Sequence, residues 1–117
     1  MLSLGSNFDS ERNIFDASDR LVEALGAGLS FGEARFSAAV GLPGSPDFLN
    51  RLVEGETNLD MVSLMAILKR IEREMGRTPE DKSAGKIVID IDILVWNGEV
   101  VNKRTYEAEF VQALQKR

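Results

Sequence analysis

The feature that most constrains this chain is a ten-residue run, Ile87 to Trp96, in which isoleucine and aspartate alternate. The run reads Ile-Val-Ile-Asp-Ile-Asp-Ile-Leu-Val-Trp, and it is followed by Asn97-Gly98 and then Glu-Val-Val. β-Branched residues in alternation predict a β-strand, and an Asn-Gly pair predicts a tight turn that returns the chain as a hairpin. We therefore expect a strand and a hairpin in this part of the chain.

The two aspartates of this strand, Asp90 and Asp92, are expected to face the same way. Side chains alternate along a strand, so the flanking isoleucines pack on the opposite face. At about 3.3 Å of rise per residue the two backbones lie roughly 7 Å apart, which suits a two-magnesium site. Two anions within an apolar strand need a compensating cation. The alternative is that this face of the sheet is open to water and both carboxylates are solvated.

Composition narrows the chemistry that the chain can perform. The chain has 117 residues and contains neither cysteine nor histidine. Its length predicts one domain over residues 1–117. Disulfides, thiolate nucleophiles, serine-histidine triads and histidine-liganded zinc are excluded, so carboxylates, Lys, Arg, Tyr and backbone groups remain. Any metal would be one that prefers oxygen ligands.

Charge and hydropathy exclude several kinds of partner. The formal net charge is −5, which gives no basic footprint for nucleic acid or an anionic membrane. A phosphate ligand stays possible where basic groups gather or a metal bridges the charges. No apolar stretch is long enough to span a membrane, and residues 1–12 lack the pattern of a signal peptide, so we expect a cytoplasmic protein. Leu2 to Leu4 resembles the end of a strand, and we expect a few residues to be missing before it.

Two helices are predicted by apolar residues at helical spacing. The first has its apolar positions at Ile14, Leu21, Val22 and Leu25. Asp9 or Ser10 is expected to cap it, and Gly26 and Gly28 are expected to end it. The second has its apolar positions at Leu64, Ile67, Leu68, Ile71 and Met75, with Asn58 or Asp60 as the cap and Gly76 as the stop. Both are expected to pack an apolar face against a sheet.

The order of the elements predicts the fold class. Residues 29–39 and 48–57 are compatible with strands, residues 41–46 and 77–86 are predicted loops, and residues 106–115 form a short closing helix at best. The resulting order is strand, helix, strand, strand, helix, strand. This order predicts an α+β ferredoxin-like βαββαβ sandwich with an antiparallel sheet and helices on one face, extended by the hairpin and the short helix.

Several segments together resemble the hydroxymethyl-dihydropterin pyrophosphokinase family of folate synthesis. They are Gly5-Ser6-Asn7, Pro46-Asp47-Phe48-Leu49-Asn50, Ile71-Glu72 through Gly76-Arg77, and Ile89-Asp90-Ile91-Asp92-Ile93-Leu94 before Asn-Gly-Glu-Val-Val. They occur in the family's order and span nearly the whole chain. The resemblance implies an enzyme that transfers a pyrophosphoryl group from ATP to 6-hydroxymethyl-7,8-dihydropterin and releases AMP.

The resemblance also implies a role for each motif. The family's metal aspartates fall on Asp90 and Asp92, which would hold two magnesium ions against the ATP phosphates. Asn50 would bind the edge of the pterin ring, with Phe48 and Phe110 stacking on its two faces. The loop with Gly41 and Leu42 would also face this substrate. Ordinary core packing is the alternative for the two phenylalanines, and turn capping is the alternative for Asn50.

The phosphate contacts depart from the family pattern. The family's Arg-Trp-Gly-Pro-Arg-Thr loop corresponds to Ser-Ala-Gly-Lys-Ile-Val at residues 83–88, and the later histidine and arginine are absent. Four basic residues remain as candidates for ATP and catalysis: Arg77, Lys86, Lys103 and Arg104. A lysine offers a point charge without the two-pronged contact of arginine. Lys86 can equally be a solvated loop residue.

Three alternatives to the pyrophosphokinase stay open. A catalytically impaired homologue could bind the pterin or the nucleotide without transferring the group. A ferredoxin-like module for sensing or interaction could carry Asp90 and Asp92 as solvated residues. RNA binding on the sheet is disfavoured by the acidic charge and by the lack of a basic-aromatic stretch. The sequence leaves the oligomeric state undetermined.

Overall fold

The computed structural model describes residues 1–37, 46–107 and 109–115. Its sheet strands are β1 (Leu2–Ser6), β2 (Ser30–Phe31), β3 (Arg35–Ser37), β4 (Phe48–Glu54) and β5 (Asp90–Ile93), and a separate hairpin is formed by β6 (Val95–Trp96) and β7 (Glu99–Val100). Its helices are α1 (Ser10–Leu25), α2 (Met61–Glu74), α3 (Pro79–Ser83), α4 (Lys103–Tyr106) and α5 (Glu109–Gln115).

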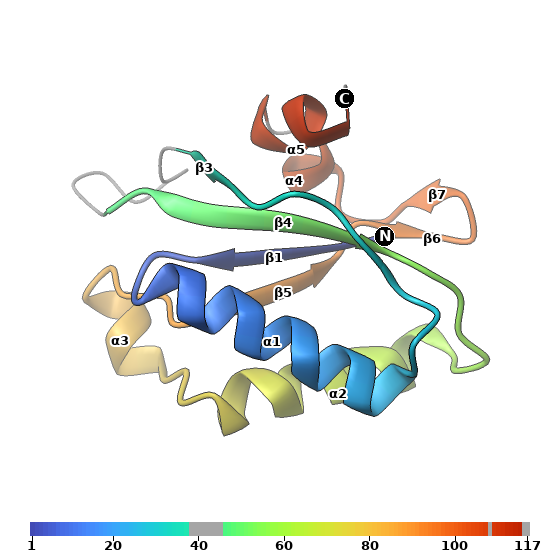
Figure 1. Ribbon diagram of the computed structural model, residues 1–117, viewed down its shortest axis with the longest axis horizontal. Helices are drawn as coiled ribbons and strands as arrows, with labels where there is room; N and C mark the ends of the chain where they lie inside the picture. Colours follow the sequence, from blue (N-terminus) through green and yellow to red (C-terminus); the bar gives the residue numbers. More distant parts are fainter. Residues whose placement is uncertain (38–45, 108, 116–117) are drawn as a thin grey trace.

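The strands pair in the order β2-β4-β1-β5, with β3 also on β4, and every pairing is antiparallel. Helices α1 and α2 cover one face of the sheet, whereas α4 and α5 lie on the other side (Figure 1). The strand order and the two long helices confirm the predicted α+β, ferredoxin-like architecture. The C-terminal helices add a partial layer to the face that α1 and α2 leave free.

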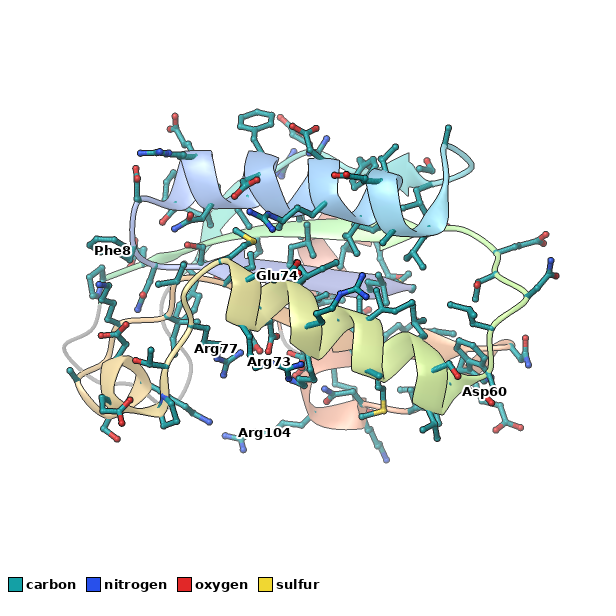
Figure 2. The ribbon with its side chains drawn as sticks, turned by 90° about the horizontal axis from the view of Figure 1, so that it is seen from below. Phe8, Asp60, Arg73, Glu74, Arg77 and Arg104 are labelled. Atoms are coloured by element: carbon teal, nitrogen blue, oxygen red, sulfur yellow. The ribbon has the colours of Figure 1, made fainter. Side chains whose placement is uncertain are left out.

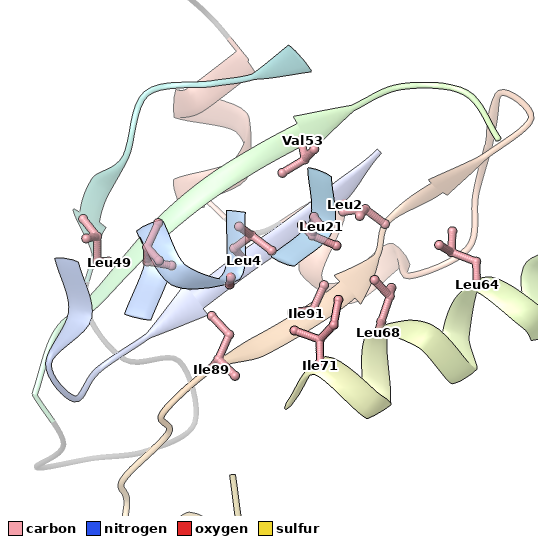
Figure 3. Close-up of a cluster of buried hydrophobic side chains, with 12 residues drawn as sticks. Leu2, Leu4, Leu21, Leu49, Val53, Leu64, Leu68, Ile71, Ile89 and Ile91 are labelled. Carbon is pink, nitrogen blue, oxygen red and sulfur yellow. The ribbon is translucent and has the colours of Figure 1, made fainter. Parts of the chain in front are cut away.

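The main core lies between the sheet and helices α1 and α2. Figure 3 shows Leu4 of β1 and Ile91 of β5 directed toward Leu21 of α1 and Ile71 of α2, and all four side chains are almost completely buried. Fully burying a side chain of this size contributes about 1.5–3 kcal/mol. Since Leu4 and Ile91 are paired across the two strands, their neighbours in sequence project from the opposite face.

A smaller cluster lies on the opposite face of the sheet. Leu52 and Leu94 pack there against Val111 and Leu114 of α5. These contacts hold α5 against β4 at Leu52, two residues along the strand from Asn50. The residues on this same face beyond the cluster include the two aspartates of β5, which are only partly buried.

The helix predictions are confirmed with three adjustments. Val22 is 37% exposed, so the prediction that it belongs to the buried face of α1 is wrong. Asp9 occupies the first cap position with a positive φ of 45°, but its side chain makes no capping hydrogen bond. Asp60 rather than Asn58 caps α2, by accepting a hydrogen bond from the backbone N–H of Ser63 at 2.7 Å. None of the helices in the described ranges has the length and hydropathy needed to cross a membrane.

Two local predictions near the C-terminus are wrong. The strand predicted over residues 87–96 is regular only over β5 and β6, and it does not begin at Ile87 because the backbone there is hydrogen-bonded to Asn7 instead of continuing the ladder. The predicted loop 77–86 contains α3, since Thr78 accepts a capping hydrogen bond from the N–H of Asp81 and Pro79 stands at the start of the helix. The Asn97-Gly98 hairpin is confirmed, with both turn residues at positive φ.

Candidate active site

Three residues on adjacent strands form a row across the free face of the sheet. Gly5 of β1 is paired with Asn50 of β4 on one side and with Asp90 of β5 on the other. At about 4.8 Å between strands, Asn50 and Asp90 lie roughly 10 Å apart. The sequence-predicted pterin residue and the first predicted metal residue are therefore brought to opposite ends of one short row. Glycine occupies the middle of this row.

The absence of a side chain at Gly5 shapes this row. A Cβ atom built there would lie 3.5 Å from the Cδ2 atom of Phe48 and 3.6 Å from the Oδ1 atom of Asn50. The half-buried ring of Phe48 thus borders the same space as the Asn50 amide. Phe48 and Asn50 are therefore neighbours over Gly5 on the free face of the sheet, and their predicted roles at the pterin stay predictions.

Asn50 is held firmly in place. Its side chain is almost completely buried, and its Nδ2 atom donates to the Oγ atom of Ser37 at 2.7 Å and to the carbonyl oxygens of Phe48 and Arg35 at 3.2 and 3.3 Å. These bonds occupy the amide's donor group, whereas Oδ1 faces the space over Gly5. In this orientation Asn50 presents an acceptor to a ligand's N–H. Turn capping does not describe this residue, because it lies within β4.

Asp90 and Asp92 share the free face of β5, as the alternation predicted. Burial, the charge of Asp90 and a hydrogen bond with the Asp90 carboxyl group together raise the pKa of Asp92 to about 7. Lys69 acts in the opposite direction. The prediction that these two anions need a compensating cation therefore has a physical basis in the structure, because burial and the charge of Asp90 favour a proton on Asp92.

Arg77 lies against Asp90 at the end of α2. Its Nη1 atom donates to Asp90 Oδ1 at 2.7 Å and to the carbonyl oxygen of Ile89 at 3.3 Å. Burial alone would lower the pKa of Arg77, but the hydrogen bond with Asp90 and the charges of Asp90, Glu72 and Asp92 raise it above its usual value. Figure 2 shows Arg77 beyond the end of α2 that is remote from Asp60. The structure thus brings Arg77, a predicted ATP-binding and catalytic residue, into contact with Asp90, and its role stays a prediction.

Glu72 is a site residue to which the sequence analysis gave no role. Its side chain is only 4% exposed, and its Oε2 atom accepts a hydrogen bond from the N–H of Ile91 at 2.7 Å and lies 3.2 Å from Arg77 Nη1. A signal was available in the sequence. Leu64, Leu68 and Glu72 are spaced four residues apart, so the carboxylate lies on the apolar face of α2. An acid in that position needs a buried partner.

Lys86 lies in a turn that Asn7 holds beside the sheet. Asn7 donates to the carbonyl oxygen of Gly85 and accepts from the N–H of Ile87, each at 2.7 Å. The ammonium of Lys86 lies 4.0 Å from the centre of the Phe8 ring and 3.9 Å from Asp81 Oδ2. Within the described residues no ion pair joins Lys86 to either aspartate of β5. Its predicted role in catalysis and phosphate binding stays a prediction.

A cavity of about 460 Å³ opens beside Asp92. Its lining comes from α2, β5 and the chain around α4: Met61, Met65, Leu68, Lys69, Ile91, Asp92, Ile93, Val101, Asn102, Lys103 and Arg104. Lys103 and Arg104, which the sequence predicted as nucleotide contacts, thus share a cavity with a predicted metal ligand. Lys69 is a third basic residue on the same wall, and the sequence analysis did not select it because exposed lysines on helices are common.

Three predicted substrate residues cannot be compared with the structure. Gly41, Leu42 and the side chain of Phe110 lie outside the part of the chain that the structure describes. Their predicted roles at the pterin stay predictions.

The two carboxylates on β5 suit magnesium, which also takes ligands from substrate and water, better than a metal bound by protein ligands alone. No group of three or more Asp, Glu, His or Cys side chains gathers as a metal cage within the described ranges. Magnesium is commonly held by one or two carboxylates together with substrate phosphates and water. Asp90 and Asp92, with an adjacent cavity bordered by basic residues, match that pattern.

Comparison with known families identifies the family of this chain. A model of the 7,8-dihydro-6-hydroxymethylpterin-pyrophosphokinase family matches residues 1–115. The chain belongs to this family. The resemblance drawn from the Gly-Ser-Asn, Asn50 and Asp90 motifs is thereby confirmed.

Individual pyrophosphokinase relatives agree with this assignment. The chain is 30% identical over 122 residues to the folate synthesis bifunctional protein of Arabidopsis thaliana, covering 97% of this chain and 25% of that protein. It is 38% identical over 82 residues to the 2-amino-4-hydroxy-6-hydroxymethyldihydropteridine pyrophosphokinase of Bacillus subtilis, covering 63% and 48%. For the enzyme of that name from Aquifex aeolicus the identity is 34% over 104 residues, covering 88% and 64%. The chain spans about a quarter of the plant protein and less than two thirds of either bacterial one.

Proposed function

We propose that this protein transfers a pyrophosphoryl group from ATP to the hydroxymethyl oxygen of 6-hydroxymethyl-7,8-dihydropterin, as a step of folate biosynthesis. The observation that carries the proposal is the row Asn50–Gly5–Asp90, which runs across three paired strands. One small bicyclic substrate can touch the amide at one end of this row and bring its reacting oxygen toward the carboxylates at the other. Family membership supplies the chemistry, and the row supplies the geometry.

The pterin is proposed to bind at the Asn50 end. Asn50 Oδ1 would accept a hydrogen bond from an N–H on the ring edge, and Phe48 would offer an aromatic face. Because Asn50 is fixed by three donor bonds, it would not need to reorganise when the substrate arrives. Preorganised polar groups of this kind lose little entropy on binding.

The nucleotide is proposed to occupy the cavity beside Asp92. Met61, Met65 and Ile93 give it apolar walls suited to a purine base, and Lys69, Lys103 and Arg104 give it positive charge suited to phosphates. ATP in this cavity would direct its phosphates toward the aspartates of β5. The absence of most family arginines makes these three basic residues the natural replacements.

Asp90 and Asp92 are proposed to hold magnesium between the protein and the phosphates. Bound by these two carboxylates, magnesium would supply positive charge that neutralises the phosphates. A new bond forms between the hydroxymethyl oxygen and the β-phosphorus as the hydroxyl proton passes to water, the bond from the β-phosphorus to the α,β-bridging oxygen breaks, and AMP leaves with the bonding electrons. The residues of this chain contribute position and charge: Asn50 orients the pterin, and Arg77 offers a cation beside Asp90.

A second function is favoured by one observation. Lys86 is engaged by Phe8 and Asp81, and residues 83–88 lack the arginines and tryptophan of the family loop. A protein with an intact pterin end and a weakened phosphate end would bind the pterin and transfer the group slowly or not at all.

The experiment that separates the two functions is an assay of AMP release. Purified protein is mixed with hydroxymethyl-dihydropterin, ATP and Mg²⁺, and AMP is quantified over time, while pterin binding is measured separately by fluorescence. AMP that depends on both the pterin and Mg²⁺ supports the enzyme. Pterin binding without AMP supports the binding protein, and binding of neither ligand contradicts both.

A further inference from the structure

A buried acid on α2 connects the two aspartates to the rest of the protein. Glu72 accepts a hydrogen bond from the N–H of Ile91, the residue that lies between Asp90 and Asp92. In the described sheet β5 pairs only with β1, so this N–H points away from its partner strand and would be unsatisfied without Glu72. An unsatisfied buried N–H costs about 1–3 kcal/mol. Glu72 therefore fixes the backbone at Ile91, between the two proposed metal ligands.

Glu72 also shares Arg77 with Asp90. The same guanidinium nitrogen, Nη1, lies 3.2 Å from Glu72 Oε2 and 2.7 Å from Asp90 Oδ1. The Oε1 atom of Glu72 accepts from Lys69 Nζ at 3.3 Å, so both carboxylate oxygens are engaged. The charged side chains therefore form a series of contacts from α2 to the free face of the sheet, in the order Glu72, Arg77, Asp90.

This series of contacts bears on how Asp90 can bind a metal. A guanidinium hydrogen-bonded to Asp90 competes with a cation for the same oxygen. With Glu72 present, Arg77 keeps an anionic partner when Asp90 turns to the metal. Without Glu72, Arg77 would interact with Asp90 alone. Turning Asp90 toward the metal would then leave a buried guanidinium unpaired, which is costly.

We propose that Glu72 is a positioning residue for the magnesium site: it fixes β5 between the two aspartates and holds Arg77 so that Asp90 is available to the metal. This inference rests on the proposed function only in taking Asp90 and Asp92 as metal ligands. It concerns a residue that contacts neither substrate.

The test is a direct measurement of metal binding with no nucleotide present. Mn²⁺ replaces Mg²⁺ as the probe, and its free concentration is followed by electron paramagnetic resonance in wild-type protein and in Glu72→Gln. Glutamine has the same length and keeps an oxygen for the Ile91 N–H, but it loses the charge that holds Arg77. We expect Mn²⁺ affinity to fall about tenfold.

Glu74→Gln is the matched control, because Glu74 lies two residues further along α2 and forms only exposed ion pairs with Arg20 and Arg70. It removes the same charge, and we expect less than about a twofold change in Mn²⁺ affinity. Thermal unfolding of both variants without metal checks that the fold is retained. Equal Mn²⁺ affinities for the two variants would overturn the inference.

Arg77→Met tests the route of the effect and leaves Glu72 intact. If Arg77 competes for Asp90, Arg77→Met should bind Mn²⁺ as tightly as wild type or a few-fold more tightly, and adding Glu72→Gln to it should change the affinity less than about twofold. A tenfold loss that persists in the double variant would mean that Glu72 acts as a distant negative charge, which overturns the inference. Weaker binding by Arg77→Met alone would overturn it as well, even if Glu72→Gln did not fold.

The AMP assay separates a failure of the Glu72 inference from a failure of the proposed function. Wild-type protein that releases AMP while Glu72→Gln binds Mn²⁺ normally overturns the inference alone. Wild-type protein that neither releases AMP nor binds Mn²⁺ overturns both.

Discussion

The two ends of the candidate site are built differently. At the pterin end Asn50 is buried and its amide nitrogen is bonded to three protein oxygens. At the phosphate end the basic residues stand on a helix face and a short helix, and the side chain of Lys103 is 80% exposed. The proposed pterin end is thus already held by protein hydrogen bonds, whereas the proposed phosphate end consists of exposed basic side chains. Under the proposed function, specificity for the pterin would depend on preformed hydrogen bonds and affinity for the nucleotide on exposed charge.

The largest effect should come from the aspartates that join the two ends. Asp92→Asn and Asp90→Asn are expected to reduce Mg²⁺-dependent AMP release by about a thousandfold, because the metal loses a charged ligand. Pterin binding without metal should change little. The free energy of unfolding should be unchanged or higher, because repulsion between the carboxylates is relieved. Substantial destabilisation of both variants in urea unfolding would instead assign the pair a structural role.

The next effect should be confined to the pterin end. Gly5→Val fills the space bordered by Phe48 and Asn50, and we expect pterin affinity, measured by fluorescence, to fall about a hundredfold. ATP affinity should change less than about twofold. Gly28→Val is a suitable control, since a side chain at Gly28 would meet nothing within 4 Å. Retained pterin affinity in Gly5→Val would contradict the row as the pterin site.

A smaller effect should be confined to the phosphate end. The double variant Lys103→Ala/Arg104→Ala is expected to weaken ATP binding about tenfold at low salt, and the difference should shrink as ionic strength rises, because exposed charges are screened. The control Arg12→Ala/Lys82→Ala removes the same charge from α1 and α3. Calorimetric titration of ATP at two salt concentrations measures both. A loss of pterin affinity in the first variant would show that the two ends are not separable.

The smallest effect concerns pH and the free energy of unfolding. The pKa of Asp92 is raised from 3.8 to about 7 by burial and by Asp90, so the folded state keeps a proton that the unfolded state has released. The associated stability is complete below pH 3.8 and is lost as pH rises through about 7. For metal-free protein we expect a decline of about 1–2 kcal/mol between pH 5 and 8, discounted for partial solvent access. Asp92→Asn should lack this decline in urea titrations; an identical decline would show that another group causes it.

Local patterns predicted the parts of the molecule that depend on neighbours in sequence. Alternation alone placed Asp90 and Asp92 on one face, and Asn97-Gly98 alone predicted the hairpin. The contact between Glu72 and Ile91 was not predicted, because it depends on how α2 packs against the edge strand β5. Family resemblance connected Asn50 with the aspartates, and the pairing through Gly5 gave that connection its geometry.

The error at Ile87 has an equally specific cause. Ile87 has the composition of a strand residue, but Asn7 takes its backbone N–H, which a pattern within residues 87–96 cannot reveal. The charge of Lys86 and its position in the sequence predict a phosphate contact, and in the structure its ammonium lies over the ring of Phe8; its role at the phosphates stays a prediction. Long-range partners decide both outcomes, and a single sequence does not specify them.

The most direct test of the central claim measures the proximity of pterin and metal. Mn²⁺ bound at Asp90 and Asp92 should strongly enhance the nuclear relaxation of protons on a pterin bound at Asn50, because the row spans only about 10 Å. The account predicts enhanced relaxation of the bound pterin in wild-type protein and its loss in Asp90→Asn. Pterin that binds with unchanged relaxation in the presence of protein-bound Mn²⁺ would contradict it.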